Sequence, residues 1–129
     1  MSVPAGFRTA IGREIETLAW TWWLDNRPAS RLLARNYRRR GGELDLVVEE
    51  YRASGAKDLV FIEVRARRGP GRWVSGLESV DHVKRACLER AARSYLWGYR
   101  GNARGVRFDV LDWDGDRFHH YESAWTPRA

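Results

Sequence analysis

Residues 59–67, with the sequence LVFIEVRAR, give the strongest β-strand signal in the chain. The even-numbered positions are all apolar, whereas the odd-numbered positions include Glu63 and Arg65. This period of two predicts a strand with one apolar face and one face that carries charge. A carboxylate and a guanidinium two residues apart are therefore expected on the same side of a sheet.

The preceding apolar segment, residues 43–50 with the sequence ELDLVVEE, alternates in a similar way. Leu44, Leu46 and Val48 are expected on one face, and Asp45 on the other. Only a short polar segment separates this strand from the next, so the two are predicted to form an antiparallel hairpin. The hairpin would place acidic residues on adjacent strands.

Two helices are expected around these strands, over residues 8–25 and residues 80–97, because apolar residues recur there at helical spacing. Ser79 is the expected N-cap of the second helix. The apolar stripes comprise Ile11, Ile15, Leu18, Ala19, Trp22 and Trp23 in the first helix, and Val80, Val83, Cys87, Ala91 and Tyr95 in the second. Further strands are expected at residues 31–37, 106–113 and 117–124.

The resulting order is one helix, three strands, one helix and two strands. Three strands in succession do not fit a repeated β-α-β winding, so the order predicts an α/β fold with a mixed central sheet flanked by helices. With 129 residues, the chain is expected to form one domain over residues 1–129. About seven residues at its start and about four at its end are expected to be flexible.

The composition excludes several classes of protein. The single cysteine, Cys87, excludes an internal disulfide framework and a zinc site with several cysteines. A reducing, cytoplasmic setting is the simplest expectation. No apolar run approaches the roughly 18 residues that a membrane span requires, so no membrane association is expected.

Basic residues outnumber acidic residues by 23 to 17, and 21 of the 23 are arginine. Residues 65–107 hold eleven basic and three acidic residues, and residues 31–40 hold five arginines. Such clustering is typical of a nucleic-acid footprint, because each neutralised phosphate releases counterions. The alternative is a codon bias that favours Arg and Trp, and composition does not separate the two.

Acidic side chains on adjacent strands are the strongest sign of chemistry. Asp45 and Glu63 would place two like charges close together, which requires a compensating cation. Carboxylates, a backbone carbonyl and water are the hard oxygen ligands that suit Mg²⁺ or Mn²⁺. Alternatively, both acids lie on a solvated face of the sheet and pair with Arg65 or Arg67.

Two further residues flank this pair of acids. Glu16 borders the apolar stripe of the first helix and either reaches the site or is an ordinary boundary acid, with Glu14 equally placed on the other side. Lys84 falls within the apolar stripe of the second helix. Its stem either covers apolar surface or directs the amine toward the acids, where it would bind a phosphate.

Three segments together resemble the YraN family of small bacterial proteins, which have a restriction-endonuclease-like fold and are similar to Holliday-junction resolvases. The segments are residues 41–47 (GGELDLV), residues 59–67 (LVFIEVRAR) and residues 107–110 (RFDV). Residues 33–38 (LARNYR) and Glu78-Ser79-Val80 with Lys84 fit the same pattern. The resemblance extends over residues 9 to 125, and the order of the motifs agrees with the α-β-β-β-α-β core of that fold.

The resemblance implies a metal-dependent phosphodiesterase site. Glu16 matches the acid of the first helix, Asp45 and Glu63 match the metal ligands, and Arg65 occupies the basic position of a Glu-x-Lys motif. Nucleases of this fold usually have lysine there. Arginine stays protonated, so Arg65 can stabilise charge on a phosphate but cannot act as a general base.

The leading hypothesis is therefore a Mg²⁺- or Mn²⁺-dependent endonuclease that acts on structured or branched DNA. Arg65 and Lys84 would contact the scissile phosphate, and Arg67, Arg68 and Arg72 would bind the nucleic-acid backbone. Trp73 would stack on a base or pack within its loop. A homodimer is expected by analogy with junction resolvases, with the tryptophans either at an interface or in the core.

Two other classes remain open. The first is a non-catalytic nucleic-acid-binding module that keeps the nuclease scaffold, which Arg65 favours. The second is an interaction protein that binds no nucleic acid. Binding that weakens steeply with salt is expected for the endonuclease and for the nucleic-acid-binding module, but not for the interaction protein.

Overall fold

Five strands form one mixed sheet, and they lie in it in the same order as in the chain. The computed structural model describes residues 5–66 and 81–127. The strands are β1 (Ser30–Arg39), β2 (Gly42–Tyr51), β3 (Lys57–Ala66), β4 (Gly105–Trp113) and β5 (Phe118–Trp125). Only β3 and β4 are parallel, because the chain crosses over between them through a helix. All other neighbouring strands pair in antiparallel fashion.

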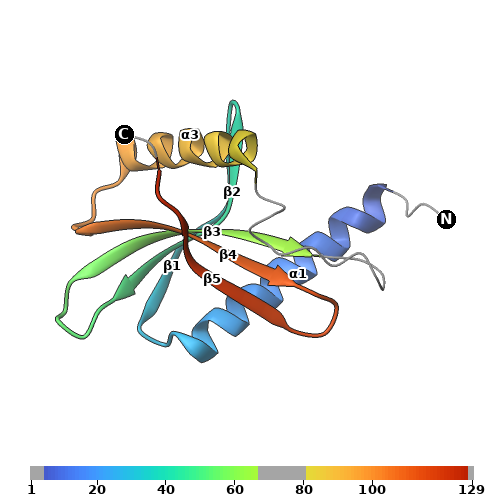
Figure 1. Ribbon diagram of the computed structural model, residues 1–129, viewed down its shortest axis with the longest axis horizontal. Coiled ribbons are helices and arrows are strands. Elements are labelled where there is room, and N and C mark those ends of the chain that lie inside the picture. The colour runs from blue at the N-terminus through green and yellow to red at the C-terminus, as the bar shows by residue number, and fades with distance from the viewer. Residues whose placement is uncertain (1–4, 67–80, 128–129) are drawn as a thin grey trace.

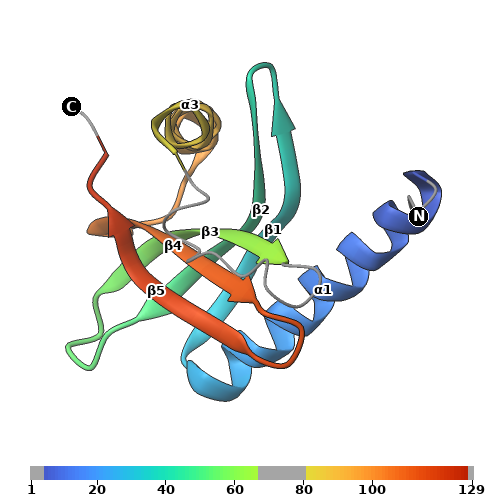
Figure 2. The same ribbon diagram turned by 45° about the vertical axis from the view of Figure 1, so that its right-hand side comes forward.

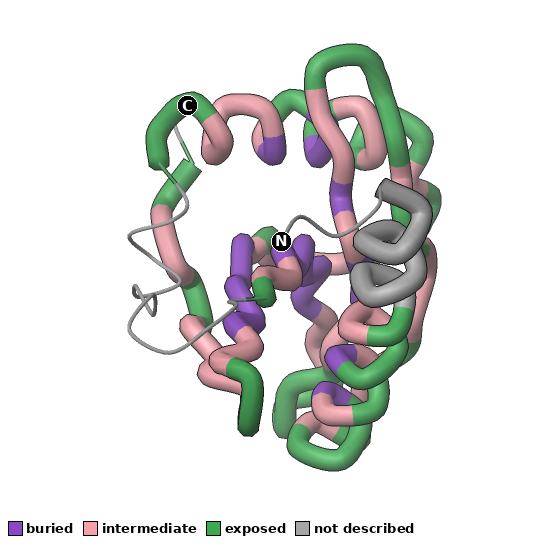
Figure 3. Tube along the Cα trace, turned by 90° about the vertical axis from the view of Figure 1, so that its right-hand side faces the viewer, coloured by how far each residue is buried: buried purple, intermediate pink, exposed green. Residues whose placement is uncertain are grey.

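The two described helices, α1 (Ala5–Asn26) and α3 (His82–Gly98), cover opposite faces of the sheet (Figure 1). On the face of α3, Leu59 and Phe61 pack with Leu88 of the helix. On the face of α1, Val60 and Ile62 pack with Trp23, which is fully buried. Figure 3 shows the buried residues concentrated where the sheet meets the helices. The predicted order of elements and the α/β class are confirmed.

The start of the second helix differs from the prediction. α3 begins at His82, and its N-cap is Asp81, whose carboxylate accepts a hydrogen bond of 2.9 Å from the Lys84 backbone N–H. The predicted cap, Ser79, lies outside the described residues. Val83 is 60% exposed and does not belong to the buried stripe, because that stripe is formed by Leu88 together with neighbouring alanines.

The strict alternation predicted for β2 is also wrong. Leu46 and Val48 pack on the α1 face, but Leu44 packs with Val47 on the α3 face. The change of face occurs at Asp45, where β2 stops pairing with β3 and continues as a partner of β1 alone. The tip of the β1–β2 hairpin thereby rises beside α3 (Figure 2).

Gly42 allows this hairpin to approach α3. A Cβ atom at position 42 would lie 2.2 Å from the backbone oxygen of Cys87 and 3.2 Å from the Cβ of Ala91. The preceding Gly41 has a φ of 87° and ends the tight turn before β2. Close packing of the hairpin on α3 therefore depends on the missing side chain of Gly42.

Replacing Gly42 with alanine is expected to lower the free energy of unfolding by about 1–3 kcal/mol, because α3 must move away from β2. Equilibrium urea unfolding would measure the change. Gly98→Ala is the matched control, because no atom lies within 4 Å of a Cβ added at position 98. Gly55→Ala is unsuitable as a control, because Gly55 has a φ of 90°, which an alanine adopts only with strain. An equal effect of Gly42→Ala and Gly98→Ala would contradict the proposed contact.

A buried polar network joins the sheet to the end of α1. Asp109 is fully buried and accepts hydrogen bonds of 2.8 and 3.1 Å from Arg107 and of 2.7 Å from His120. The ring of His120 packs edge-on against Trp22 and Trp23 of α1, with centroids 5.5 and 5.0 Å apart. The network thus orients a side chain on which α1 packs.

None of the described helices is long and apolar enough to cross a membrane. The expected flexible ends fall partly outside the described residues, which begin at position 5 and end at position 127.

Candidate functional site

The candidate site lies where β2 separates from β3. Pairing between these strands runs from Tyr51 opposite Lys57 to Leu46 opposite Ile62. One residue before Leu46, the Asp45 carboxylate accepts a hydrogen bond of 2.8 Å from the backbone N–H of Val64. A side chain thus takes the place of a strand partner, which keeps a β3 donor satisfied while the backbones diverge.

Glu63 contributes the second carboxylate of the site from the α3 face of β3. Its side chain is only 6% exposed, which rules out the alternative of a solvated acid. The Glu63 Oε1 atom lies 3.4 Å from Arg65 Nη1 and 3.7 Å from Lys84 Nζ. Two cations, one from β3 and one from α3, therefore converge on one carboxylate oxygen.

The Lys84 amine is directed toward Glu63, in line with one of the two interpretations of its position in the sequence. The N-terminal turn of α3 places it over the sheet, and its side chain remains 41% exposed. The amine is therefore able to contact both a buried acid and a ligand that approaches from solvent. Nearby, a surface pocket of about 560 Å³ is lined by Lys84 together with Arg38 and Glu43 from the β1–β2 hairpin.

The pKa of Asp45 is raised well above its ordinary value, first because burial disfavours the charged form and then because the charge of Glu63 lies nearby. The hydrogen bond from Val64 acts in the opposite direction but does not outweigh these effects. Two carboxylates in this arrangement are stabilised by a proton or by a cation. A bound divalent metal is one such cation.

Glu16 of α1 is half-buried, whereas Glu14 is exposed. The Asn36 side-chain amide, with its nitrogen turned toward α1, donates to the two carboxylate oxygens of Glu16 at 2.7 and 3.0 Å. Burial raises the pKa of Glu16, and the charge of Glu16 in turn helps to raise the pKa of Asp45. The two acids are therefore electrostatically linked.

The donor set fits a hard divalent cation in part. Within residues 14–66 and 81–127, no group of three or more His, Cys, Asp or Glu side chains is arranged to hold a metal ion. Asp45 and Glu63 supply two carboxylates, and Mg²⁺ is often held by one or two carboxylates with water and substrate phosphates completing the shell. The pair is thus compatible with a metal that binds together with its substrate.

Two features of the site were not predicted from the sequence. Asn36, which holds Glu16, has a left-handed φ of 51°, a conformation that asparagine tolerates better than most residues. Asp112 is fully buried and lies beside Arg65 in the parallel register of β3 and β4. The signal for Asp112 was present in the sequence as an acid between the apolar residues of VLDW.

The predicted nucleic-acid contacts Arg67, Arg68, Arg72 and Trp73 lie outside the described residues. The structure brings together Asp45, Glu63, Arg65 and Lys84, with Glu16 at the edge of this group.

The order of elements, with acids at the point where two central strands diverge, defines a restriction-endonuclease-like α/β domain. Residues 15–112 match the family described as "Uncharacterised protein family UPF0102". The chain belongs to the UPF0102 family, which confirms the resemblance to YraN.

Relatives from several bacteria share most of the chain. The UPF0102 protein of Ralstonia nicotianae is 40% identical over 100 residues, which cover 76% of this chain and 74% of the relative. A UPF0102 protein of Anaeromyxobacter dehalogenans is 36% identical over 122 residues, covering 92% and 85% of the two chains. A third, from Burkholderia pseudomallei strain K96243, is 39% identical over 113 residues, covering 88% and 73%.

Proposed function

We propose that this protein is a divalent-metal-dependent endonuclease that acts on structured or branched DNA. The observation that carries the proposal is the convergence of Arg65 and Lys84 on the buried carboxylate of Glu63, beside a second carboxylate from Asp45. Paired acids with adjacent cations suit a phosphodiester, since the acids bind a metal and the cations neutralise the phosphate.

Asp45 and Glu63 would hold Mg²⁺ or Mn²⁺. When bound, such an ion lowers the pKa of a coordinated water and so supplies the hydrolytic nucleophile. Lys84, with a side chain 41% exposed, would donate hydrogen bonds to a non-bridging phosphate oxygen. Arg65 would stabilise charge that develops on the phosphate, and Glu16 would help to hold water near Asp45.

Cleavage of a branched-DNA panel with Mn²⁺ tests the proposal. The panel contains a four-way junction, a forked duplex and a linear duplex. Glu63→Gln removes one charge at nearly constant shape and is expected to lower the initial rate by at least about 100-fold. Glu14→Gln is the matched control, because Glu14 is an exposed acid on α1.

Equal cleavage by the wild type and Glu63→Gln would mean that the activity belongs to another site on the protein or to a contaminating nuclease. Absence of cleavage by the wild type on every substrate would overturn the proposal. A branched substrate cut on two strands needs two active sites, so we also propose a homodimer. Sedimentation of the protein with and without a junction would test this part independently.

A second candidate is a non-catalytic nucleic-acid-binding module, and Arg65 favours it. Its guanidinium lies 3.4 Å from Glu63, and a guanidinium, unlike a lysine amine, does not serve as a general base for water. Salt-dependent binding of the junction by the wild type and by Glu63→Gln, without cleavage by either, would support this alternative.

A further inference from the structure

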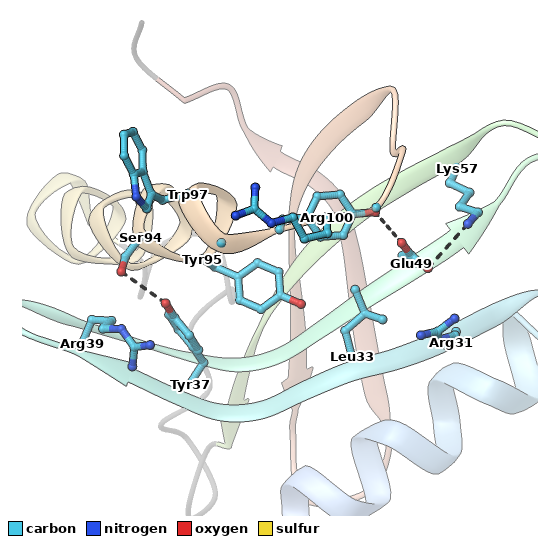
Figure 4. Close-up of a pocket in the computed structure, with 13 residues that line it drawn as sticks. Arg31, Leu33, Tyr37, Arg39, Glu49, Lys57, Ser94, Tyr95, Trp97 and Arg100 are labelled. Atoms are coloured by element: carbon cyan, nitrogen blue, oxygen red, sulfur yellow. Dashed lines mark hydrogen bonds and ion pairs between the residues drawn. The ribbon is translucent and has the colours of Figure 1, made fainter.

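A second recess on the α3 face lies at the far end of that helix from Lys84. It has a volume of about 810 Å³ and is bounded by the C-terminal part of α3 and by strands β1 to β3 (Figure 4). Its aromatic floor includes Tyr37 and Tyr95, whose ring centroids lie 5.2 Å apart in an edge-to-face arrangement. Tyr37 is further held by a hydrogen bond of 3.2 Å between its hydroxyl and that of Ser94.

Cations surround this recess. Arg31 and Arg39 lie along β1, and Arg100 follows α3; all three are exposed. Over the described parts of the chain, none of these three arginines forms an ion pair with a carboxylate. By contrast, Arg107 on the opposite face is tied to the buried Asp109. The arginines of the recess are thus free to bind an external anion.

The one acid among the described lining residues, Glu49, already has partners within the protein. It is 4% exposed, accepts a hydrogen bond from the Tyr99 hydroxyl, and lies 3.9 Å from the Lys57 amine. Burial and this hydrogen bond raise the pKa of Tyr99 to about 12, so the hydroxyl keeps its proton and remains a donor. The recess therefore presents a net positive surface to a ligand.

Trp97 adds an exposed aromatic surface to the rim. It is 90% exposed, and Figure 4 shows it on the side of α3 that faces away from the strands. An indole that is 90% exposed, beside arginines that form no ion pair within the described residues, suits single-stranded nucleic acid, in which bases stack on aromatic rings and phosphates contact cations. Duplex DNA hides its bases and would not use Trp97 in this way.

The two pockets on this face share Arg39. The pocket next to Lys84 and the aromatic recess are both lined by its side chain, which stacks at 4.2 Å over the ring of Tyr37. Thirteen residues of α3 separate Lys84 from Trp97, which corresponds to about 20 Å along the helix axis. One strand is able to run along α3 from the candidate active site to the recess.

We propose that this recess binds an unpaired, single-stranded arm of the nucleic-acid substrate. The inference rests on the proposed function for the identity of that substrate. Bases of the arm stack on Trp97, and its phosphates contact Arg39 and Arg100. The substrate class is therefore a forked or flapped structure with a single-stranded extension, rather than a fully paired duplex.

Fluorescence anisotropy with a labelled dT12 oligonucleotide, in EDTA, tests this binding without cleavage. Trp97→Ala is expected to weaken binding by about 5- to 150-fold, the range for loss of one stacked base. Arg100→Ala is expected to weaken binding and to reduce the slope of log K against log salt by about 0.7. Arg117→Ala, at an exposed site in the turn between β4 and β5, is the matched control and is expected to bind like the wild type.

Equal dT12 affinity in the wild type, Trp97→Ala and Arg100→Ala would overturn the inference. Competition by free dTMP as effective as competition by dT12, compared at equal nucleotide concentration, would also overturn it in favour of a mononucleotide pocket. Glu63→Gln is expected to keep wild-type dT12 binding. If Glu63→Gln no longer cleaves branched DNA but still binds dT12, the loss lies in the active site. If dT12 binding is absent from the wild type as well, the proposed role of the recess is wrong.

Discussion

Replacing Asp109 with alanine is expected to lower the free energy of unfolding by about 3–5 kcal/mol, the range for breaking a buried charge pair. Asp109 is fully buried and joins Arg107, His120 and the Ser123 backbone N–H, the last at 3.0 Å. Its removal leaves the guanidinium of Arg107 without its nearest carboxylate and leaves His120 free to turn away from α1. Urea unfolding monitored by circular dichroism would measure the loss.

The effect of Asp109 depends on pH with a defined sign. Burial alone would raise the pKa of its carboxyl, but hydrogen bonds from His120 and Arg107 outweigh burial and hold the pKa below its usual value. A lowered pKa in the folded state stabilises the protein above the unfolded value of about 3.9, and this stabilisation is lost as the pH falls through the folded value. The difference between wild type and Asp109→Ala is therefore expected to shrink below pH 4.

Asp116→Ala provides the control for Asp109→Ala, because Asp116 is an exposed acid in the turn between β4 and β5. It is expected to change the free energy of unfolding by less than about 0.5 kcal/mol. A loss of stability in Asp109→Ala no greater than in Asp116→Ala would show that the buried network does not hold α1 on the sheet.

Asp45→Asn is expected to stabilise the metal-free protein while it lowers the proposed cleavage by more than about 100-fold. The amide oxygen can still accept the hydrogen bond from Val64, but the charge buried next to Glu63 is removed. The free energy of unfolding at pH 7.5 is therefore expected to rise, since a carboxyl whose pKa is raised by folding opposes folding when it is charged. A gain in stability at the cost of activity is typical of a functional site.

Thermal unfolding with and without Mn²⁺ separates the structural and functional roles of Asp45. Mn²⁺ is expected to raise the Tm of the wild type and to leave the Tm of Asp45→Asn unchanged, because binding to the folded state stabilises it. Glu14→Gln is expected to respond to Mn²⁺ like the wild type. Lower stability of metal-free Asp45→Asn would mean that the carboxylate is a structural group whose charge is well compensated.

Sequence periodicity predicted the elements well because each described helix packs one side on the sheet, and because side chains alternate between the two covered faces along β3. The alternation around Glu63 placed it with Phe61 on one side of β3, and the structure confirms this. The same reasoning failed at Leu44, because alternation assumes a strand with constant partners. β2 changes partners at Asp45, and periodicity contains no information about that change.

The sequence predicted those residues of the candidate site that are charged and stand among apolar neighbours. Acids within apolar strands drew attention to Asp45 and Glu63, and a lysine within an apolar helical stripe drew attention to Lys84. Asn36 and the buried Asp112 were missed. Their roles depend on contacts between elements far apart in the chain, which local spacing does not encode.

Sequence alone determined the α/β class, the order of elements, the family and the choice of acids. These follow from the spacing of apolar residues and from residue type, both of which can be read from the sequence without knowledge of the tertiary contacts. The tertiary structure decided which arginines form ion pairs with carboxylates of the protein and which are available to an external ligand. Arg107 is held by Asp109 of its own strand β4 and by Glu50 from β2, whereas Arg39 and Arg100 form no ion pair within the described residues and line an aromatic recess. The net charge does not distinguish them, because ion pairing depends on distances that only packing sets.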